Sequence, residues 1–469
     1  MTTPFSRCPL AQALVGASLL LGSLSSQAAG FQLNETSGSG LGVAYAGGAA
    51  SAEDAATLWS NPAGLSRLTS RQMVSVLHLI TPSIKFSNDA STAASQQVLG
   101  GNGGDAGGLN VVPNFYLAMP INNTLAVGVG VNAPWGLVTE FDAGWAGRFL
   151  ASKSAIQTLN INPALSWKPA ANLSLGLGLN LQRMVAEFTN DVNYSAALLS
   201  AAGANGIAPG SVTFNAIAAA TPGLVSAARI KGSDNATGWN AGVLWEVTPQ
   251  QRVGLHYRSA VRYQLEGSVH FDNPTPVVAG ALGATVTALS NGVNGTALFD
   301  SGIQAEVKLP PIANLSYFGA IDARWDLMAD LQWTGWSTIE TLRFVRSNGS
   351  VLQSTPENFR DSYKLAIGAN YRPGGNWLWR MGVAVDQSPV RDGFRTPRLP
   401  DGDRTWLTGG AQFRPNPNWR FDLGAAYVWA KRVEIDDTGS DPSGRASGRL
   451  NGHYNNNTLI LSGQAAWSF

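Results

Sequence analysis

Apolar and polar residues alternate along most of the chain with a period of two. From Leu173 to Gln182, leucine occupies every odd position, and Ser, Gly, Asn or Gln occupies every even position. The same alternation starts again at Trp419 and recurs in the last segment, which ends at Phe469. Because successive side chains of a strand point to opposite faces, each segment predicts a strand with one apolar face and one small or polar face.

The length of these segments separates a membrane barrel from a soluble sandwich. Strands of soluble sheets usually have about five or six residues, whereas a tilted strand needs about 9–11 residues to cross a bilayer. An even strand number is typical of a single chain that closes into an outer-membrane barrel. The sequence predicts fourteen such strands, near residues 71–80, 111–120, 124–133, 156–168, 172–189, 237–247, 251–268, 304–319, 324–344, 361–373, 376–388, 404–414, 418–433 and 457–469.

The connections and the strand ends fit the same fold. Turn residues fill short connections such as 169–172 and 415–418, whereas the connections 190–236 and 269–303 are long. We therefore predict an all-β fold: a fourteen-stranded antiparallel transmembrane β-barrel over residues 70–469. Tryptophans near the predicted strand ends resemble the aromatic girdles of such barrels, namely Trp167, Trp245, Trp325, Trp377, Trp379, Trp406, Trp419 and Trp467.

Residues 1–28 have the composition of a secretory signal peptide. Arg7 precedes an uncharged run from Leu10 to Leu24, and Ser26-Gln27-Ala28 supplies the small residues of a cleavage site. A transmembrane anchor is the less favoured alternative, because a spanning helix needs about 20 apolar residues. We expect an exported chain that resides in the cell outer membrane.

Residues 29–69 precede the first predicted strand and show no alternation. They are rich in Gly and Ala and carry few charges. A barrel much wider than eight strands is not filled by its own side chains. The segment is therefore predicted to form a hatch, or plug, inside the lumen, with a disordered periplasmic tail as the alternative.

Composition excludes several classes of function. The formal net charge is +1, with 31 Lys and Arg against 30 Asp and Glu, so there is no basic excess for binding nucleic acid. The single cysteine, Cys8, excludes an internal disulfide framework. The sequence contains neither a Gly-x-Ser-x-Gly nucleophile elbow nor a cluster of metal-ligating residues with zinc-site spacing. We therefore expect that the protein is not an enzyme and binds no cofactor or metal. Asp436, Asp437 and Asp441 are interpreted as a solvated acidic patch.

Short motifs occur in order from one end of the mature chain to the other. They are Gly30–Glu35, Ser39–Gly42, Ala44-Tyr45, Asp54-Ala55, Asn61–Ala63, Val112–Asn114, Gly136–Phe141, Leu309–Pro311, Trp336-Ser337, Asp386–Val390 and Leu399–Arg404. Together they resemble the FadL-type family of outer-membrane transporters for long-chain fatty acids and other hydrophobic compounds. The resemblance implies a fourteen-stranded barrel with an N-terminal hatch. It also implies passive uptake, with sideways release through the barrel wall.

The resemblance places a lateral opening at Pro134, Trp135 and Gly136. Pro134 cannot donate a ladder hydrogen bond and Gly136 tolerates a bend, so a gap in the wall is physically reasonable there. An ordinary strand end is the alternative interpretation.

The resemblance also assigns five residues to the hatch. The triplet Asn61, Pro62 and Ala63 is expected to face the lateral opening, and Phe31 and Asp54 belong to the same hatch motifs. Taken alone, an Asn-Pro-Ala triplet is only a turn signal.

For the ligand carboxylate, the resemblance implies two basic residues near the inner end of the site. One aligns with Arg343 and the other with Asn190, which carries no charge. A guanidinium can bind a carboxylate through two hydrogen bonds, but a neutral amide cannot replace a second cation. Pairing of Arg343 with Glu340 is the alternative.

The leading hypothesis is a passive outer-membrane transporter of long-chain fatty acids, which captures its ligand in an apolar groove formed by the long loops. Because Asn190 lacks a charge, a channel for monoaromatic hydrocarbons of the same family stays open, as does a general water-filled porin. We expect a monomer surrounded by outer-membrane lipid and lipopolysaccharide.

Overall fold

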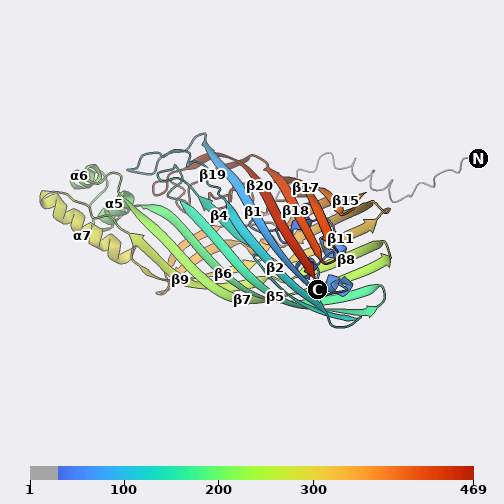
Figure 1. The fold of residues 1–469 in the computed structure, drawn as a ribbon. Helices are drawn as coiled ribbons and strands as arrows, with labels where there is room; N and C mark the ends of the chain where they lie inside the picture. The colour runs from blue at the N-terminus through green and yellow to red at the C-terminus, as the bar shows by residue number, and fades with distance from the viewer. Residues whose placement is uncertain (1–29) are drawn as a thin grey trace, which may run out of the picture.

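The computed structural model describes residues 30–469, so the predicted signal peptide, residues 1–28, lies outside the described part. A ring of long tilted strands encloses a lumen, with helices at one end and short turns at the other (Figure 1). The ring is closed, because β1 pairs with β2 on one side and with β20 on the other.

Twenty β-segments build the wall, and all their pairings are antiparallel. They are β1 (Gln72–Asn88), β2 (Asn110–Pro120), β3 (Leu125–Asn132), β4 (Gly136–Glu140), β5 (Lys153–Ala170), β6 (Leu173–Asn193), β7 (Val225–Thr248), β8 (Gln251–Arg258), β9 (Val261–Asp272), β10 (Ser301–Leu309), β11 (Ile312–Ala320), β12 (Trp325–Thr334), β13 (Thr341–Arg346), β14 (Val351–Pro356), β15 (Ser362–Gly374), β16 (Trp377–Asp386), β17 (Arg404–Asn416), β18 (Trp419–Ala430), β19 (Val433–Asp437) and β20 (Leu450–Ser468).

These segments form fourteen transmembrane strands, because six strands are interrupted once along their length. The interrupted strands are β3/β4, β8/β9, β10/β11, β12/β13, β14/β15 and β18/β19. The prediction of a closed, all-β, fourteen-stranded antiparallel barrel is therefore confirmed. Several strands are longer than predicted: residues 225–236 pair with 182–193, so the connection predicted at 190–236 runs only from Asn193 to Val225.

The strands bury their polar face and expose their apolar face. In β6, Leu177 and Leu179 are 63% and 59% exposed, whereas Gly178, Asn180 and Gln182 point into the lumen. This arrangement is the reverse of a soluble protein, in which apolar side chains are inside, and it matches a wall that faces lipid. None of the helices in residues 30–469 is long and apolar enough to cross a membrane.

Tryptophans form a girdle at the end with the short turns. Trp377 stacks on Trp379, and Trp419 stacks on Trp467. The prediction was wrong for Trp406, which is buried in the lumen because even-numbered residues of β17 point inward.

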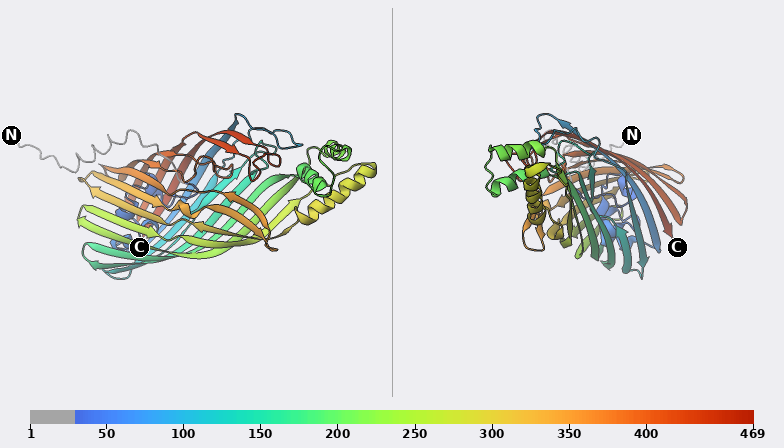
Figure 2. Two further views of the ribbon diagram at one scale, coloured as in Figure 1. Left: turned by 180° about the vertical axis from the view of Figure 1, so that it is seen from behind. Right: turned by 90° about the vertical axis from the view of Figure 1, so that its left-hand side faces the viewer.

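The segment before β1 fills the lumen with short helices (Figure 2). This hatch contacts β17, β18 and β20 through α2, and β8 and β11 through α3. Small residues allow its backbone to lie against the wall, so the predicted hatch is confirmed as part of the fold. Its elements are α2 (Gly38–Leu41), α3 (Gly48–Ser51), α4 (Thr57–Ser60) and η1 (Pro62–Arg67).

The two long outer connections fold into helices that pack on one another (Figure 1). They contain α5 (Tyr194–Ala204), α6 (Val212–Ala220) and α7 (Gly280–Thr296). The Tyr194 hydroxyl lies 2.6 Å from Ser290 Oγ and donates to Asn294 Oδ1 at 2.8 Å. Apolar residues of these helices pack with strand residues such as Phe188, Tyr263 and Phe344 in one buried cluster, and we call the outer part of the barrel that this cluster fills the outer chamber.

Candidate functional site

One gap interrupts the ladder between β2 and the strand β3/β4. Residues Asn110–Asn114 of β2 pair with β1, but the β2–β3 ladder starts only at Phe115, opposite Val131. Within the described part of the chain, β4 pairs with β5 alone. We call the gap between Asn110–Asn114 and Gly136–Glu140 the window. Its upper edge is closed where Glu140 N donates to Ala106 O at 3.0 Å.

The residues between β3 and β4 explain the gap. Pro134 has no N–H to donate, and the carbonyl oxygen of Pro134 accepts a hydrogen bond from Leu33 N at 2.9 Å instead of from β2. The Trp135 side chain turns into the lumen and is buried. The predicted opening residues therefore lie at the window.

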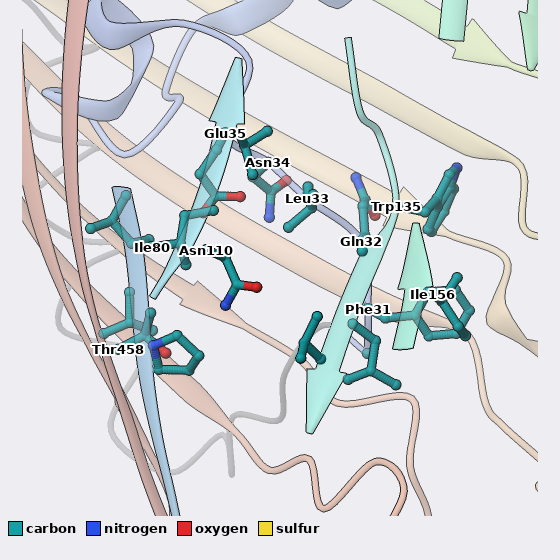
Figure 3. A pocket seen from close by; sticks show the side chains of 18 of the residues that line it. Phe31, Gln32, Leu33, Asn34, Glu35, Ile80, Asn110, Trp135, Ile156 and Thr458 are labelled. Atoms are coloured by element: carbon teal, nitrogen blue, oxygen red, sulfur yellow. The ribbon is translucent and has the colours of Figure 1, made fainter. Parts of the chain in front are cut away.

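A cavity with a volume of about 490 Å³ passes through the window (Figure 3). Its lining includes Leu109 and Val111, which are 65% and 55% exposed on the outside of the barrel. The lining also includes Arg404 and Trp406, which point into the lumen. Residues from both faces of the wall therefore line the cavity.

Residues 30–35 of the hatch, which we call the arm, lie in the window like a short added strand. Leu33 N donates to Pro134 O, and Gly136 N donates to Phe31 O at 3.0 Å. Farther along the arm, Asn114 Nδ2 donates to the carbonyl oxygen of Glu35 at 2.8 Å. The backbone of the arm therefore forms hydrogen bonds with β2 on one side and with the β3/β4 strand on the other, where these two strands do not pair with each other.

Four aromatic side chains meet at the lumen side of the window. The Phe31 ring lies 5.9 Å from Trp135 and 5.0 Å from Trp336, and the two tryptophan centroids are 5.4 Å apart. Phe359 completes this aromatic cluster at 6.0 Å from Trp336. All contacts are edge to face, which is a favoured geometry for aromatic rings.

The start of the arm is held by polar groups of β17 and of the outer connection that precedes it. Gly30 N donates to Asp401 Oδ2 at 2.8 Å, and Arg404 Nη2 donates to Gly30 O at 3.2 Å and to Asp401 Oδ1 at 2.8 Å. Ser388 Oγ also donates to Asp401, at 2.9 Å. These bonds and the aromatic cluster fix both faces of the arm.

The predicted triplet Asn61–Ala63 lies elsewhere in the hatch. Asn61 Nδ2 donates to Ala49 O at 2.7 Å and to Val243 O at 3.0 Å, and Ala63 O accepts a bond from Ser166 Oγ at 3.0 Å. Pro62 begins η1. The triplet therefore joins the hatch to β5 and β7, and the arm, rather than the triplet, occupies the window.

A buried ion-pair network ties the hatch to the opposite wall. Arg380 Nη2 lies 2.6 Å from Glu53 and 3.0 Å from Asp422. Burial alone would raise the pKa of Glu53, but the Arg380 guanidinium outweighs it and lowers the pKa to about 2. Neighbouring Asp54 accepts a bond from Gln464 Nε2 at 2.8 Å, and burial raises the pKa of Asp54.

The structure does not bring Arg343 and Asn190 together. Arg343 is exposed on the outer face of β13, while its neighbour Phe344 points inward. Asn190 faces Arg398, whose Nη2 donates to Asn190 Oδ1 at 3.2 Å. The cation beside the uncharged position is therefore Arg398, which sequence reasoning missed.

Arg398 is a buried guanidinium with neutral partners. Its Nη1 donates to Ser154 Oγ at 3.3 Å, and its guanidinium carbon lies 5.3 Å from the Phe188 ring centroid. Burial lowers the pKa of Arg398 to about 10, partly offset through space by Glu357 and Asp437. Burial likewise raises the pKa of Glu357 to about 7. Arg398 directly precedes the Leu399–Arg404 motif, but only the fold places it beside Asn190.

Comparison with known proteins extends these observations. A family described as outer membrane protein transport protein (OMPP1/FadL/TodX) matches residues 19–469. The long-chain fatty acid transport protein of Escherichia coli (strain K12) is 30% identical over 427 residues, covering 87% of this chain and 90% of that protein.

Solved structures agree with the fold. A FadL homologue of Pseudomonas aeruginosa superposes with a TM-score of 0.82 at 25% identity, covering 94% of this chain and 100% of that chain. The toluene transporter TodX of Pseudomonas putida superposes with a TM-score of 0.61 at 17% identity, covering 88% of this chain and 94% of that chain. The chain belongs to the OMPP1/FadL/TodX family of outer-membrane transporters of hydrophobic compounds.

Proposed function

We propose that this chain carries long-chain fatty acids into the outer membrane by lateral release through the window. The cavity through the wall is the observation that supports this route most directly, because it reaches both the lumen and the lipid-facing side chains of β2. Transfer of apolar area out of water is worth about 25 cal/mol per Å². A passive carrier therefore needs no energy source beyond the ligand's own burial.

Arg398 supports a carboxylate ligand rather than a neutral one. Burying a guanidinium without a paired anion is costly, and no ion pair involves Arg398 within residues 30–469. An arriving carboxylate would supply the missing anion beside Asn190, at the base of the apolar outer chamber. The backbone of Arg398 also borders the window, since Thr139 Oγ1 donates to Arg398 O at 3.3 Å.

Binding to a matched ligand set tests the substrate. We expect the purified protein to bind a long-chain fatty acid more tightly than its methyl ester, and Arg398→Met to remove most of that difference. Arg343→Met is the matched control, because its side chain is exposed on the outer face, and it should bind like the parent. Equal affinity for acid and ester in the parent would contradict a carboxylate grip.

The aromatic hydrocarbon alternative rests on a specific observation. The aromatic cluster of Phe31, Trp135, Trp336 and Phe359 belongs to the outer chamber, and Phe31 and Trp135 also line the cavity at the window; such rings bind planar aromatic ligands well. A monoaromatic hydrocarbon belongs in the same ligand set. Tighter binding of the hydrocarbon than of the acid would favour this alternative.

A variant that closes the window tests lateral release. A Cβ at Gly136 would lie 2.9 Å from Leu33 Cδ1, so Pro134→Val with Gly136→Val crowds the Leu33 side chain of the arm and offers β2 a ladder partner. We expect ligand binding in the outer chamber to persist while uptake falls about tenfold or more. Undiminished uptake would remove the window from the route.

Conductance measurements distinguish the proposed carrier from a water-filled porin. Deletion of residues 29–69 should produce large ion currents, since the hatch fills the lumen, whereas the intact chain should conduct little. Stable large currents from the intact chain would favour a porin.

The proposed organisation keeps residues 1–28 as signal peptide, 29–69 as hatch and 70–469 as barrel, with a monomer in contact with lipid and lipopolysaccharide.

A further inference from the structure

Glu35 is a buried acid at the cavity that passes through the wall. It is 5% exposed, and it lines the cavity from the arm. Figure 3 shows Glu35 and Asn34 on the side of the cavity toward Ile80 and Asn110, opposite Trp135. The backbone carbonyl of Glu35 is bound by Asn114, but among residues 30–469 its carboxyl group forms no ion pair. A buried acid that lines a cavity without a charged partner is a candidate functional group.

Four titratable groups surround Glu35 from the elements packed against the arm. Lys364 of β15 and Arg404 of β17 are positive, Asp386 of β16 is acidic, and Tyr45 belongs to the hatch. Lys364 Nζ lies 4.6 Å from the Trp406 ring centroid and 5.2 Å from that of Tyr45. Arg404 is already bound to Asp401.

Burial has the largest influence on Glu35 and raises its pKa, while Lys364 and Arg404 act in the opposite direction through space. Glu35 therefore keeps its proton to higher pH than an exposed glutamate does. If Glu35 loses the proton, the same two cations are in place to stabilise the carboxylate that remains.

A fatty acid changes its surroundings at this cavity. In the outer chamber its carboxylate has the Arg398 guanidinium available, but beyond the window it meets Leu109, Val111 and the hydrocarbon of the membrane. A carboxylate inside a bilayer is strongly disfavoured, whereas the neutral acid is not. The head group must gain a proton before it leaves, and Glu35 lines the cavity on this route.

We propose that Glu35 donates its proton to the carboxylate of the passing fatty acid, so that the substrate leaves the window as the neutral acid. The O–H bond of Glu35 breaks, its bonding pair stays on the Glu35 oxygen, and an O–H bond forms on the substrate. The negative charge moves from the substrate to Glu35, beside Lys364 and Arg404. Glu35 takes a proton from solvent after release. This inference rests on the proposed function, because it requires both a carboxylate ligand and lateral exit.

The test compares uptake of a radiolabelled long-chain fatty acid and of its methyl ester by cells whose own transporter of this family has been deleted. Glu35→Gln removes the proton donor at nearly unchanged size, and we expect acid uptake to fall about tenfold while ester uptake stays the same. Glu35→Asp keeps a donor and should retain most of the acid uptake. In the parent, the ratio of acid to ester uptake should fall as pH rises, because deprotonated Glu35 has no proton to give. In Glu35→Gln the ratio should be low throughout.

Glu306→Gln is the matched control, since Glu306 lies in β10 away from the window, is exposed and pairs with Arg262 at 3.3 Å. It should leave both uptake rates unchanged. An equal loss of acid and ester uptake in Glu35→Gln would make Glu35 a structural residue and overturn the proposal. Unchanged acid uptake in that variant, or a ratio in the parent that does not vary with pH, would overturn it as well. If the parent took up ester but no acid, the proposed substrate itself would be wrong, which is a separate outcome.

Discussion

Trp135 and Trp336 meet edge to face inside the lumen, with ring centroids 5.4 Å apart and ring planes at 87°. Each belongs to an interruption of the wall: Trp135 lies between β3 and β4, and Trp336 lies in η2 (Trp336–Thr338) between β12 and β13. These two strands are not neighbours in the barrel. The lateral window is therefore supported from across the lumen by a second break in the wall.

Phe31 of the arm contacts both tryptophans, so the contact between the two breaks includes the hatch. A Cβ at Gly30 would lie only 2.7 Å from Trp336 Cζ2, which shows how closely the indole covers the start of the arm. Movement of Trp336 would remove packing from Gly30 and Phe31 of the arm, and loss of the arm would leave Trp135 with less packing.

Trp336→Ala should loosen the arm in the window. Removing a buried tryptophan costs about 3–5 kcal/mol of unfolding free energy, and part of that loss falls on the contacts with Gly30 and Phe31. The measurement is hydrogen exchange of the Leu33 and Gly136 amides, which donate across the arm and wall. Both should exchange faster in the variant.

Trp379→Ala controls for the loss of an indole, because Trp379 faces outward and stacks on Trp377 in the girdle. It should leave exchange at Leu33 and Gly136 as in the parent. Equal exchange in Trp336→Ala and the parent would show that the arm holds its place without the aromatic cluster.

The ion pair between Glu53 and Arg380 predicts how attachment of the hatch depends on pH. Because the pKa of Glu53 is lowered from 4.5 to about 2, its contribution to stability is complete above about pH 4.5 and is lost as pH falls through about 2. Ion leakage through reconstituted protein should therefore stay low from neutral pH to about pH 4.5 and rise below that. Asp54 acts in the opposite direction, since its raised pKa favours the buried neutral form at low pH.

Two variants test whether the Glu53–Arg380 ion pair causes the rise in ion leakage at low pH. Arg380→Met leaves the buried Asp422 and the partly exposed Glu53 without their shared cation, and loss of one partner of a buried pair typically costs about 3–5 kcal/mol, so leakage should appear at neutral pH. Glu53→Gln should remove most of the rise in leakage between pH 4.5 and 2. A rise of unchanged size in Glu53→Gln would assign the effect to other carboxyl groups.

The strand pattern was predictable because lipid imposes it. Each strand must be apolar on the outside over its full membrane depth, so the period of two is long and regular, as in Leu173–Leu181. The outer ends of β7 and β20 were missed because they extend beyond that depth, where Lys231 or Asn455 fits a strand without alternation.

The candidate site was less predictable, for two different reasons. The outward direction of Arg343 could have been found, because odd-numbered Leu327 and Leu331 of the same strand are apolar and face out. A shift of one residue along a strand reverses the face that a side chain occupies, so the resemblance alone does not fix the direction of Arg343. Arg398 offered no such signal, since it lies in an outer connection without periodicity, and only the folded contacts place it beside Asn190.

Glycines on the inner face of the wall mark where the hatch docks, and Gly254 gives the sharpest test. A Cβ at Gly254 of β8 would lie 1.9 Å from the carbonyl oxygen of Ala49 in α3. Gly254→Ala should therefore push α3 off the wall, which typically costs about 1–3 kcal/mol for an overpacked contact. The barrel itself should still assemble, because its β7–β8 and β8–β11 ladders do not depend on this contact. We expect increased ion leakage from the variant, together with the heat-dependent gel mobility of a folded barrel.

Gly463→Ala is the matched control in β20, where the nearest atom to the new Cβ is 4.0 Å away, and it should not leak. If Gly254→Ala leaked no more ions than Gly463→Ala, closure of the lumen would depend on the Glu53–Arg380 side of the hatch rather than on the close approach of α3 to the wall.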